Sequence, residues 1–508
     1  MFRQIRRLKL KYLKVFRMTI KVLAEARGAY RKAFLDQMVQ QSAGKIEVCL
    51  HFGDRDSDFD VPSLMRQEVK RARSGRIVQN TKYTSANLQL IASEEFNRSA
   101  ERFSDQLHRS SSRYQKRSHK MLNLHEYIDY YHILSDAIGR QIIEREITHA
   151  VFFDIPHLAI DSVIYDLCVS MDIPIVILTQ FFPDQIFSLS RIEDFGRCSL
   201  QTENASKYPL DICGQTSLDY MDESWQKKGP RGRLKAIHVL NLIKHLIVKS
   251  PFSLMNFTFI MHTLSRIKNS VAILPDWRDP FTKFFDHDYL DYLEYLVEYE
   301  NNSPEIESPY IYVPLHLQPE MTTSALGGKY RDQLLMIEHL HQLLPSGWKI
   351  LVKENPKQGP FARGAMFFHR LNRLQNVTMV PSDTDTKQLT KNSKLVATVT
   401  GTVAWEAIQM GIPAITFGHA WFNSLPGITS FNFKLDLEEI SNQKIDKDYL
   451  SYSAGALFQR CHKGNIDKGF FKQAVNFDKQ KNAEKIGNLL VQLLSRNVNL
   501  SFSGEIND

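Results

Sequence analysis

The sequence predicts an α/β protein with two Rossmann-like domains that face a cleft. Its 508 residues exceed what one hydrophobic core usually holds, so two or three domains are expected. In two separate stretches, short apolar runs alternate with helical periodicity, which is the pattern of parallel sheets covered by helices. A hydrophobic content of 43% and a charged content of 24% are those of an ordinary globular chain.

The N-terminal segment, residues 1–40, is predicted to contain one basic amphipathic helix over residues 1–32. Apolar residues such as Phe2, Ile5 and Leu8 recur at steps of three and four, with arginine and lysine between them. Such a helix can lie on an anionic membrane surface, dock on the body of the protein or bind a partner. The membrane interpretation predicts a peripheral protein at the inner face of the cell membrane.

The N-terminal half, residues 41–300, is predicted to be an α/β domain with loop-rich insertions at 54–120 and 182–235. Strands are expected at 45–52, 149–154 and 174–179, and helices at 124–146, 158–171, 234–269 and 286–300. The strand–helix–strand order over residues 149–179 is that of a βαβ unit, which indicates a parallel sheet.

The C-terminal half, residues 301–481, follows a polar linker at 301–308 and has the clearer rhythm. Five strands are predicted at 310–314, 348–353, 377–380, 395–400 and 414–417, separated by helices at 330–344, 362–374, 386–391 and 403–410. Residues 482–508 are predicted to be a terminal helix to 494 and a frayed tail. Because parallel sheets bind ligands beyond the carboxyl ends of their strands, we expect the site among the loops at that edge.

The triplet Thr400-Gly401-Thr402 lies where a predicted strand meets a helix. A helix start offers unpaired N–H groups to a phosphate, and glycine allows close approach. Thr402 can also cap the helix, so a capped tight turn without a ligand is the alternative. Glu406, one turn further, could hold ribose hydroxyls or be a surface acid in a favourable first turn.

Polar residues follow two other strands of this half. Lys353 could neutralise a phosphate or be a solvated charge, Asn355 could bind a base or phosphate, and Pro356 stiffens the turn. His316 and Glu320 begin the first loop and offer general-base or nucleophile chemistry. A contact with the N-terminal half is the alternative for this loop, and we assign His316 to the acceptor side.

In the N-terminal half, Asp154-Ile155-Pro156-His157 follows a buried strand. His157 is predicted to point from this loop into the cleft as a catalytic group, although a lone histidine is more often structural. Asp161 and Tyr165 are four residues apart and share a helix face, so Asp161 is assigned to the acceptor side.

Other features narrow the class of protein. Five cysteines without C-x-x-C spacing disfavour a zinc site or a disulfide framework and suit the reducing cytoplasm. No apolar run reaches the length of a membrane span, and no signal peptide is recognised. The positive charge is concentrated in the first segment without a nucleic-acid-binding motif, so nucleic acid is not an expected partner.

The runs YVPLHLQPE, KILVKENP and LVATVTGTVAWEAIQMGIPAITFG resemble the capsular polysaccharide biosynthesis protein family, over about residues 310–422. That family includes bacterial transferases that move Kdo, an acidic sugar, from CMP-Kdo. The resemblance implies a GT-B-like fold whose C-terminal half holds the nucleotide, without a bound metal or other cofactor. Lys353 and Pro356 match the family's K-E-H-P motif, in which Asn355 replaces the usual histidine. Gln318 and Glu320 resemble its glutamine-plus-acid segment, which implies that Glu320 is the catalytic carboxylate.

The expected function is therefore a nucleotide-sugar-dependent glycosyltransferase acting on a glycan or glycolipid. The donor phosphate would lie over the triplet 400–402 near Lys353, with Glu406 on the ribose, Glu320 as nucleophile or base, and the acceptor near His157. A polyol-phosphate transferase and a sugar-nucleotide epimerase are alternatives on the same fold. A non-catalytic capsule assembly or export factor is the alternative from another class.

Overall fold

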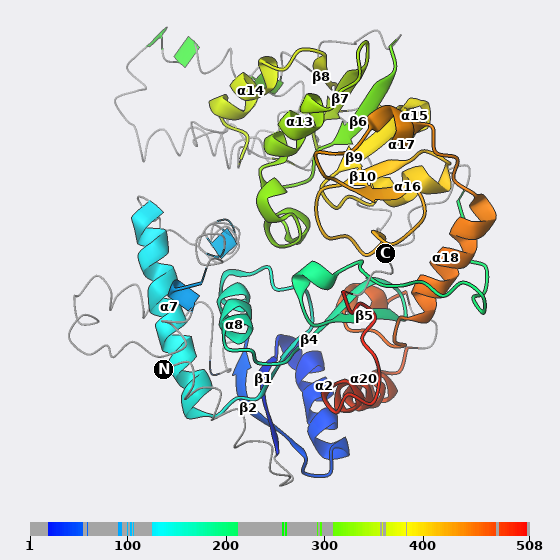
Figure 1. The fold of residues 1–508 in the computed structure, drawn as a ribbon. Coiled ribbons are helices and arrows are strands. Elements are labelled where there is room, and N and C mark those ends of the chain that lie inside the picture. Colours follow the sequence, from blue (N-terminus) through cyan, green and yellow to red (C-terminus); the bar gives the residue numbers. More distant parts are fainter. Residues whose placement is uncertain are drawn as a thin grey trace. The chain divides into compact units, whose positions relative to one another are not determined.

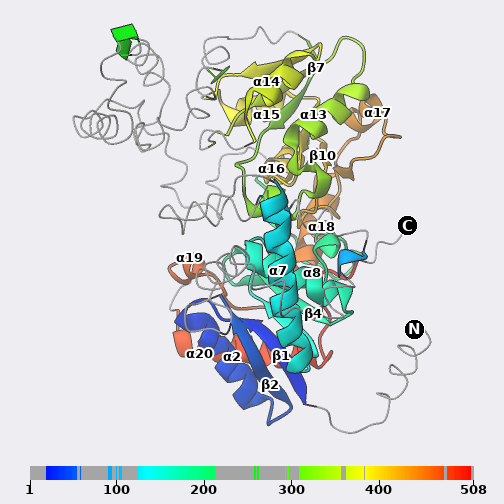
Figure 2. The same cartoon turned by 90° about the vertical axis from the view of Figure 1, so that its left-hand side faces the viewer.

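The computed structural model describes residues 19–53, 124–211, 308–355, 362–382, 384–473 and 477–504, together with a few short stretches and single positions between these ranges. The chain divides into two compact units. The first consists of residues 1–191 and 460–503, and the second of residues 192–459 and 504–508. Each unit contains one sheet with helices packed against it (Figures 1 and 2).

The first unit is built on a five-stranded sheet in the order β2-β1-β3-β4-β5. Its strands are β1 (Ile20–Glu25), β2 (Ile46–Phe52), β3 (His149–Phe152), β4 (Ile175–Phe182) and β5 (Gln185–Leu189). The first four strands are parallel, and β5 is antiparallel to β4. This is the doubly wound order 2-1-3-4-5, in which the direction of winding reverses between β1 and β3.

The helices of the first unit are α2 (Gly28–Gln41), α7 (Leu124–Glu144), α8 (Ala159–Ser170), α19 (Lys468–Phe471) and α20 (Lys479–Leu494). Helices α2 and α20 lie side by side in both views (Figures 1 and 2) and bury Leu35 and Met38 with Ile486 and Leu490 in one apolar core. A Cβ at Gly487 would lie 2.6 Å from the Cβ of Gln37, so a glycine is needed at this crossing. The predicted terminal segment 482–508 is therefore not separate, because its helix completes the core of the first unit.

The predicted basic helix over residues 1–32 is wrong from Ile20 onward, where strand β1 begins; residues 1–18 lie outside the described residues. Val22, Leu23 and Ala24 are fully buried because β1 is a central strand, covered on both faces. A strand of this kind lacks the apolar–polar alternation that distinguishes strand from helix in a sequence. Strand β5 likewise lies in a stretch predicted to be irregular.

The second unit has a six-stranded sheet in the order β11-β10-β9-β6-β7-β8, parallel throughout. The strands are β6 (Tyr310–Pro314), β7 (Lys349–Lys353), β8 (Val377–Val380), β9 (Leu395–Thr398), β10 (Ala414–Thr416) and β11 (Ile428–Ser430). The five predicted strands are confirmed, and β11 extends the series. This is the Rossmann order 3-2-1-4-5-6, which reverses between β6 and β9.

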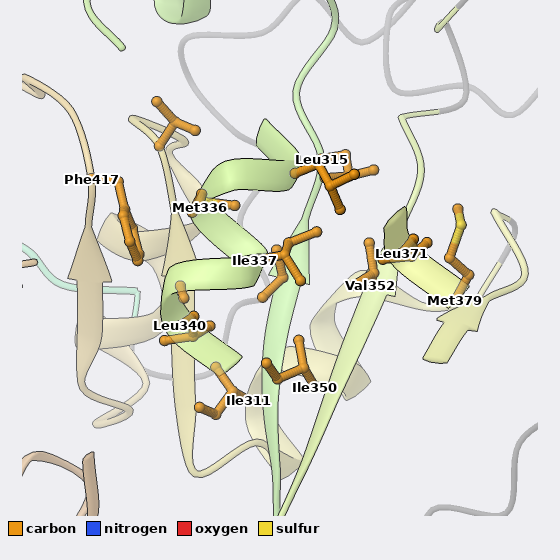
Figure 3. Packing of buried hydrophobic residues seen from close by; sticks show 14 of the residues in the cluster. Ile311, Leu315, Met336, Ile337, Leu340, Ile350, Val352, Leu371, Met379 and Phe417 are labelled. Atoms are coloured by element: carbon orange, nitrogen blue, oxygen red, sulfur yellow. The ribbon is translucent and has the colours of Figure 1, made fainter. Parts of the chain in front are cut away.

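Helices α13 (Gln333–Gln342), α14 (Ala365–Asn372), α15 (Thr386–Asn392), α16 (Val403–Gln409), α17 (Leu437–Ser441) and α18 (Lys447–Gln459) belong to the second unit. Figure 3 shows Ile337 and Leu340 of α13 pointing toward Ile311 of β6 and Ile350 of β7, and all four side chains are fully buried. No helix in the described part of the chain is long and apolar enough to cross a membrane. Most of the predicted linker and of the helices predicted over 234–300 lies outside the described residues.

Candidate functional site

A polar cluster lies at the carboxyl edge of each sheet, at the point where the strand order reverses. In the second unit, the loops after β6 and β9 bring His316 against Thr398, Thr400 and Gly401. In the first unit, the end of β1 and the loop after β3 bring Glu25 against Phe153. Ligands of doubly wound sheets bind at such reversals, so both edges are candidate sites.

In the second unit, His316 is the centre of the contact between the two loops. Its Nε2 lies 2.7 Å from Thr398 Oγ1, and the amide of Thr400 donates to the same nitrogen at 3.5 Å. The amide of Gly401 donates to Thr398 Oγ1 at 3.1 Å. A Cβ at Gly401 would lie 2.7 Å from that oxygen and 3.1 Å from His316 Cε1, so only glycine allows this approach.

These contacts change two of the predictions for this turn. The amides of Thr400 and Gly401 face inward, and Thr402 forms no side-chain hydrogen bond as the cap of α16. Within the described part of the chain, the amides of Thr402 and Val403 donate to no other group. Because β6 and β9 are neighbours, His316 lies under the Thr400–Gly401 turn. Its assignment to the acceptor side stays a prediction.

A buried network of amide side chains holds the loops of this edge together. The amide of Gln333 donates to Gln318 Oε1 at 2.8 Å and to the carbonyl of His316 at 3.0 Å, and its own oxygen accepts from the His316 amide. Gln358 Oε1 accepts from the backbone N–H of Gln318 at 2.8 Å. Arg363, 1% exposed, donates to Gln318 Oε1 at 2.8 Å and to Glu354 Oε2 at 2.7 Å. Gln318 is therefore buried, and its hydrogen bonds hold the loop after β6 in place.

Lys353 is bound to protein groups, and its predicted role at a phosphate stays a prediction. Its Nζ is buried and donates to the Thr384 carbonyl at 2.6 Å and to Thr386 Oγ1 at 2.7 Å, which ties the end of β7 to the start of α15. At the same edge, the backbone N–H of Asn355 donates to Glu354 Oε1 at 2.8 Å. Pro356 lies outside the described residues.

The two predicted carboxylates of the second unit lie on separate elements. Glu320 precedes the short π-helix η3 (Met321–Ala325), and its amide donates to Thr323 Oγ1 at 3.3 Å. Glu406 lies in the first turn of α16. Burial raises the pKa of Tyr312 on β6, and the charge of Glu406 raises it further.

His316 is neutral in the ordinary pH range. Burial, with a smaller contribution from the nearby Arg363 guanidinium, lowers the pKa of its imidazole to about 4. A ring of this kind binds through a neutral nitrogen rather than through a positive charge.

The cluster of the first unit is ionic. Glu25, 1% exposed, pairs with Arg31 and with Arg27 Nη1 at 2.9 Å, and its second oxygen accepts from the Phe153 amide at 2.9 Å. Arg27 Nη2 lies 2.7 and 2.8 Å from the two oxygens of Asp161. Asp161 is therefore buried and held by an arginine, in a position to support the edge.

Asp154 and His157 lie beside these ion pairs, after β3. Asp154 Oδ1 accepts from the Ile155 amide at 2.8 Å and from Thr179 Oγ1 at 3.2 Å, while Oδ2 lies 4.0 Å from His157 Nδ1. Burial raises the pKa of Asp154 to about 6, although Arg31 opposes the shift. His157 Nδ1 donates to the Ile155 carbonyl at 2.7 Å, so in the neutral ring Nε2 carries the lone pair.

Sequence reasoning missed several of these groups. Glu25 and Arg27 were assigned to an amphipathic helix, although Glu25-Ala26-Arg27-Gly28 directly follows an apolar run and precedes a helix, as loops at a parallel-sheet edge do. Arg363 and Gln333 lie within predicted helices or loops of ordinary polarity. No local pattern distinguishes a buried arginine from an exposed one.

The comparisons with known proteins agree with the resemblance. A family model of capsule polysaccharide biosynthesis proteins matches residues 299–455. KpsC of Thermosulfurimonas dismutans, described as a β-Kdo 2,7 transferase, is similar at 9% identity and a TM-score of 0.29, over 70% of this chain and 89% of that chain. UDP-GlcNAc 2-epimerase of Methanocaldococcus jannaschii is similar at 11% identity and a TM-score of 0.24, over 94% of this chain and 100% of that one. No curated protein matches the sequence.

The predicted α/β class with two Rossmann-like units is confirmed, since each unit contains a doubly wound sheet. The matched residues 299–455 fall within the second unit and include the edge at which His316 meets the Thr400–Gly401 turn. The second unit therefore carries, over residues 299–455, the sequence pattern of capsule polysaccharide biosynthesis proteins.

Proposed function

We propose that the chain is a glycosyltransferase of surface polysaccharide biosynthesis, which moves a sugar from a nucleotide donor to a glycan or glycolipid. The observation that carries this proposal is the overlap of the family pattern with the reversal between β6 and β9, where the His316 ring and the Thr400–Gly401 turn meet. A nucleotide bound there would lie at the usual ligand position of a doubly wound sheet.

The chemistry of this edge favours a donor with a single phosphate charge. His316 is neutral, and the amides of Thr402 and Val403 are neutral donors. Among the described residues under this edge, the cations Lys353 and Arg363 are both buried and bound to protein groups. The phosphodiester of a CMP-linked sugar carries one negative charge and a diphosphate carries two, so neutral hydrogen-bond donors suit the phosphodiester better. The proposed transferred sugar is Kdo or a related acidic sugar.

The first unit is proposed to supply the group that activates the acceptor. Asp154 has a pKa of about 6, so it is ionised at neutral pH yet remains a usable proton acceptor. His157 offers Nε2 for the same purpose, since Nδ1 donates to the Ile155 carbonyl. Glu320 is the proposed nucleophile or base on the donor side, in the same loop as His316.

The test is a transfer assay with CMP-linked and UDP-linked sugars, with a separate measurement of donor binding. Glu320→Gln should abolish transfer and leave donor binding intact. Glu439→Gln, which changes an exposed first-turn acid of α17, is the matched control and should transfer normally.

Full transfer by Glu320→Gln would remove Glu320 from the mechanism. If the product is an epimerised donor, the protein is an epimerase. If the product carries a transferred polyol phosphate, the protein is a polyol-phosphate transferase. If no nucleotide binds to the full chain, the proposal fails as a whole and a non-catalytic role in capsule assembly takes its place.

A further inference from the structure

At Nε2, the His316 ring faces the Thr400 amide and the Thr398 hydroxyl. The amide of Thr400 can only donate, and it is directed at Nε2 from 3.5 Å. If Nε2 carried a proton, that proton would oppose the Thr400 N–H across this distance. The Thr400 contact therefore requires a lone pair on Nε2.

The hydroxyl of Thr398 leads to the same assignment independently. Thr398 is fully buried, and its Oγ1 already accepts from the Gly401 amide at 3.1 Å. The hydroxyl proton then needs an acceptor, and Nε2 lies 2.7 Å away. A buried hydroxyl proton without an acceptor costs about 1–3 kcal/mol, so the arrangement with Nε2 as acceptor is preferred.

The remaining ring proton must be on Nδ1, because burial keeps the ring neutral. In the described part of the chain no group accepts a hydrogen bond from Nδ1. His316 is partly exposed, so this N–H has access to solvent or to a ligand. Its backbone is held in place by Gln333, whose amide group both accepts from the His316 amide at 2.6 Å and donates to its carbonyl.

We propose that His316 is a neutral imidazole fixed in the Nδ1–H tautomer, and that this N–H donates to a phosphate oxygen of the donor nucleotide. The proposal rests on the proposed function for the identity of the ligand, but not for the tautomer. It assigns a binding role to a residue that contributes no charge. The bound phosphate would therefore keep its affinity at pH values where a cationic histidine would lose its proton.

The tautomer is tested by a long-range ¹H–¹⁵N correlation spectrum of the histidine side chains in the labelled full-length protein, with His316→Gln used to assign the resonance. The expected result is a protonated Nδ1 and an unprotonated Nε2, unchanged between pH 5.5 and 8. A protonated Nε2, or a titration centred near pH 6.5, would overturn the tautomer.

The phosphate contact is tested by calorimetry with the methyl ester of CMP, whose single charge does not titrate in this range. His316→Asn keeps an N–H donor close to the position of Nδ1, whereas His316→Gln places its amide at the position of Nε2. We expect His316→Gln to weaken binding by roughly 10-fold or more and His316→Asn by less, because a hydrogen bond to a charged group is lost only in the first. The matched control is His369→Gln, which changes an exposed histidine of the same unit and should bind like the wild type.

The outcomes separate this inference from the proposed function. If the wild type binds the ester and His316→Gln binds it equally well, or if His316→Asn is the weaker of the two variants, the contact is disproved and the function stands. If the wild type does not bind the ester, the contact and the proposed donor fail together. Thermal unfolding of each variant shows whether lost binding is instead lost folding.

Discussion

The two sheet edges differ in the kind of polar group that they bury. The edge of the first unit contains Glu25, Asp154 and Asp161 with Arg27 and Arg31. At the strand reversal of the second unit, an imidazole, hydroxyls and backbone amides meet, and the charges of Lys353, Glu354 and Arg363 are buried beneath them in contacts with protein groups. Among the described residues of the first edge, three acids face two arginines, which is an excess of negative charge when Asp154 is ionised. That edge disfavours a phosphate and suits a proton acceptor, while the neutral donors of the second suit a phosphate ester.

The largest expected effect tests how the second edge is held. Arg363→Met should destabilise the second unit by about 3–5 kcal/mol, because the buried carboxylate of Glu354 loses its partner. Chemical denaturation with a probe in the second unit measures this loss. Arg370→Met is the control, since Arg370 pairs with Glu338 and Asp332 at the surface and should cost less than about 1 kcal/mol. Equal losses in both variants would contradict the buried network.

The equivalent change in the first unit is Glu25→Gln. It removes the negative charge shared by Arg27 and Arg31, and should destabilise the first unit by about 3 kcal/mol. Denaturation followed by a probe in the first unit is the measurement. Nucleotide binding by the second unit should not change at a temperature where the variant is folded. A variant that is as stable as the wild type would show that the ion pairs do not hold this edge.

The pH dependence of stability separates the two edges further. The pKa of His316 is about 4 in the folded chain against 6.5 for the free side chain, so the unfolded chain binds more protons between these values. The contribution of His316 to the free energy of unfolding is therefore complete above pH 6.5, and it decreases by about 3 kcal/mol as the pH falls to 4. Denaturation at pH 7 and pH 4 should show this difference between the wild type and His316→Asn. The same pH dependence in both proteins would contradict the low pKa.

Gly401→Ala probes the contact beside the imidazole. The added Cβ would lie 2.7 Å from Thr398 Oγ1, so we expect a loss of about 1–3 kcal/mol in stability and weaker nucleotide binding. Gly364→Ala is the matched control, because nothing lies within 4 Å of a Cβ there. Differential scanning calorimetry and a nucleotide titration compare the two. If Gly401→Ala has the stability and the nucleotide affinity of the wild type, the turn accommodates a Cβ at this position and the close contact does not require glycine.

Asp154→Asn is expected to have the smallest effect on stability and a large one on transfer. The raised pKa of about 6 means that the folded chain holds a proton between about pH 4 and pH 6 that the unfolded chain releases. The stability contribution of Asp154 therefore falls as the pH rises through this window, by about 1 kcal/mol after allowance for its partial exposure. Asn should remove that slope and reduce transfer at pH 7. Wild-type transfer rates in Asp154→Asn would exclude it as the proton acceptor.

The sequence predicted the second unit better than the first, for a physical reason. The strands from Tyr310–Pro314 to Ala414–Thr416 are apolar runs bounded by turn residues, and each is followed by a helix. Strand β1 has no such boundary on its N-terminal side, because basic and apolar residues continue into it from residue 1. The core that joins α2 to α20 links residues more than 400 positions apart, which no local pattern records.

The candidate site shows the same limit. The turn at Thr400-Gly401-Thr402 and the loop after β6 could be predicted as neighbours from the order of the strands, but the inward direction of the Thr400 and Gly401 amides could not. The hydrogen bonds from Lys353 to Thr384 and Thr386 could not be predicted either. The direction of a long side chain depends on the loop that packs over it. For Lys353 that loop lies about 30 residues later in the sequence, so the local pattern does not determine the direction.

The most direct test of the account is a calorimetric titration of CMP, CDP and UDP into the full chain and into Gly401→Ala and Asp154→Asn. If the nucleotide is held at the edge of the second unit, the wild type and Asp154→Asn should bind CMP saturably and Gly401→Ala should bind it more weakly. Binding that is weakened by Asp154→Asn and unchanged by Gly401→Ala would place the nucleotide at the first unit and contradict the account.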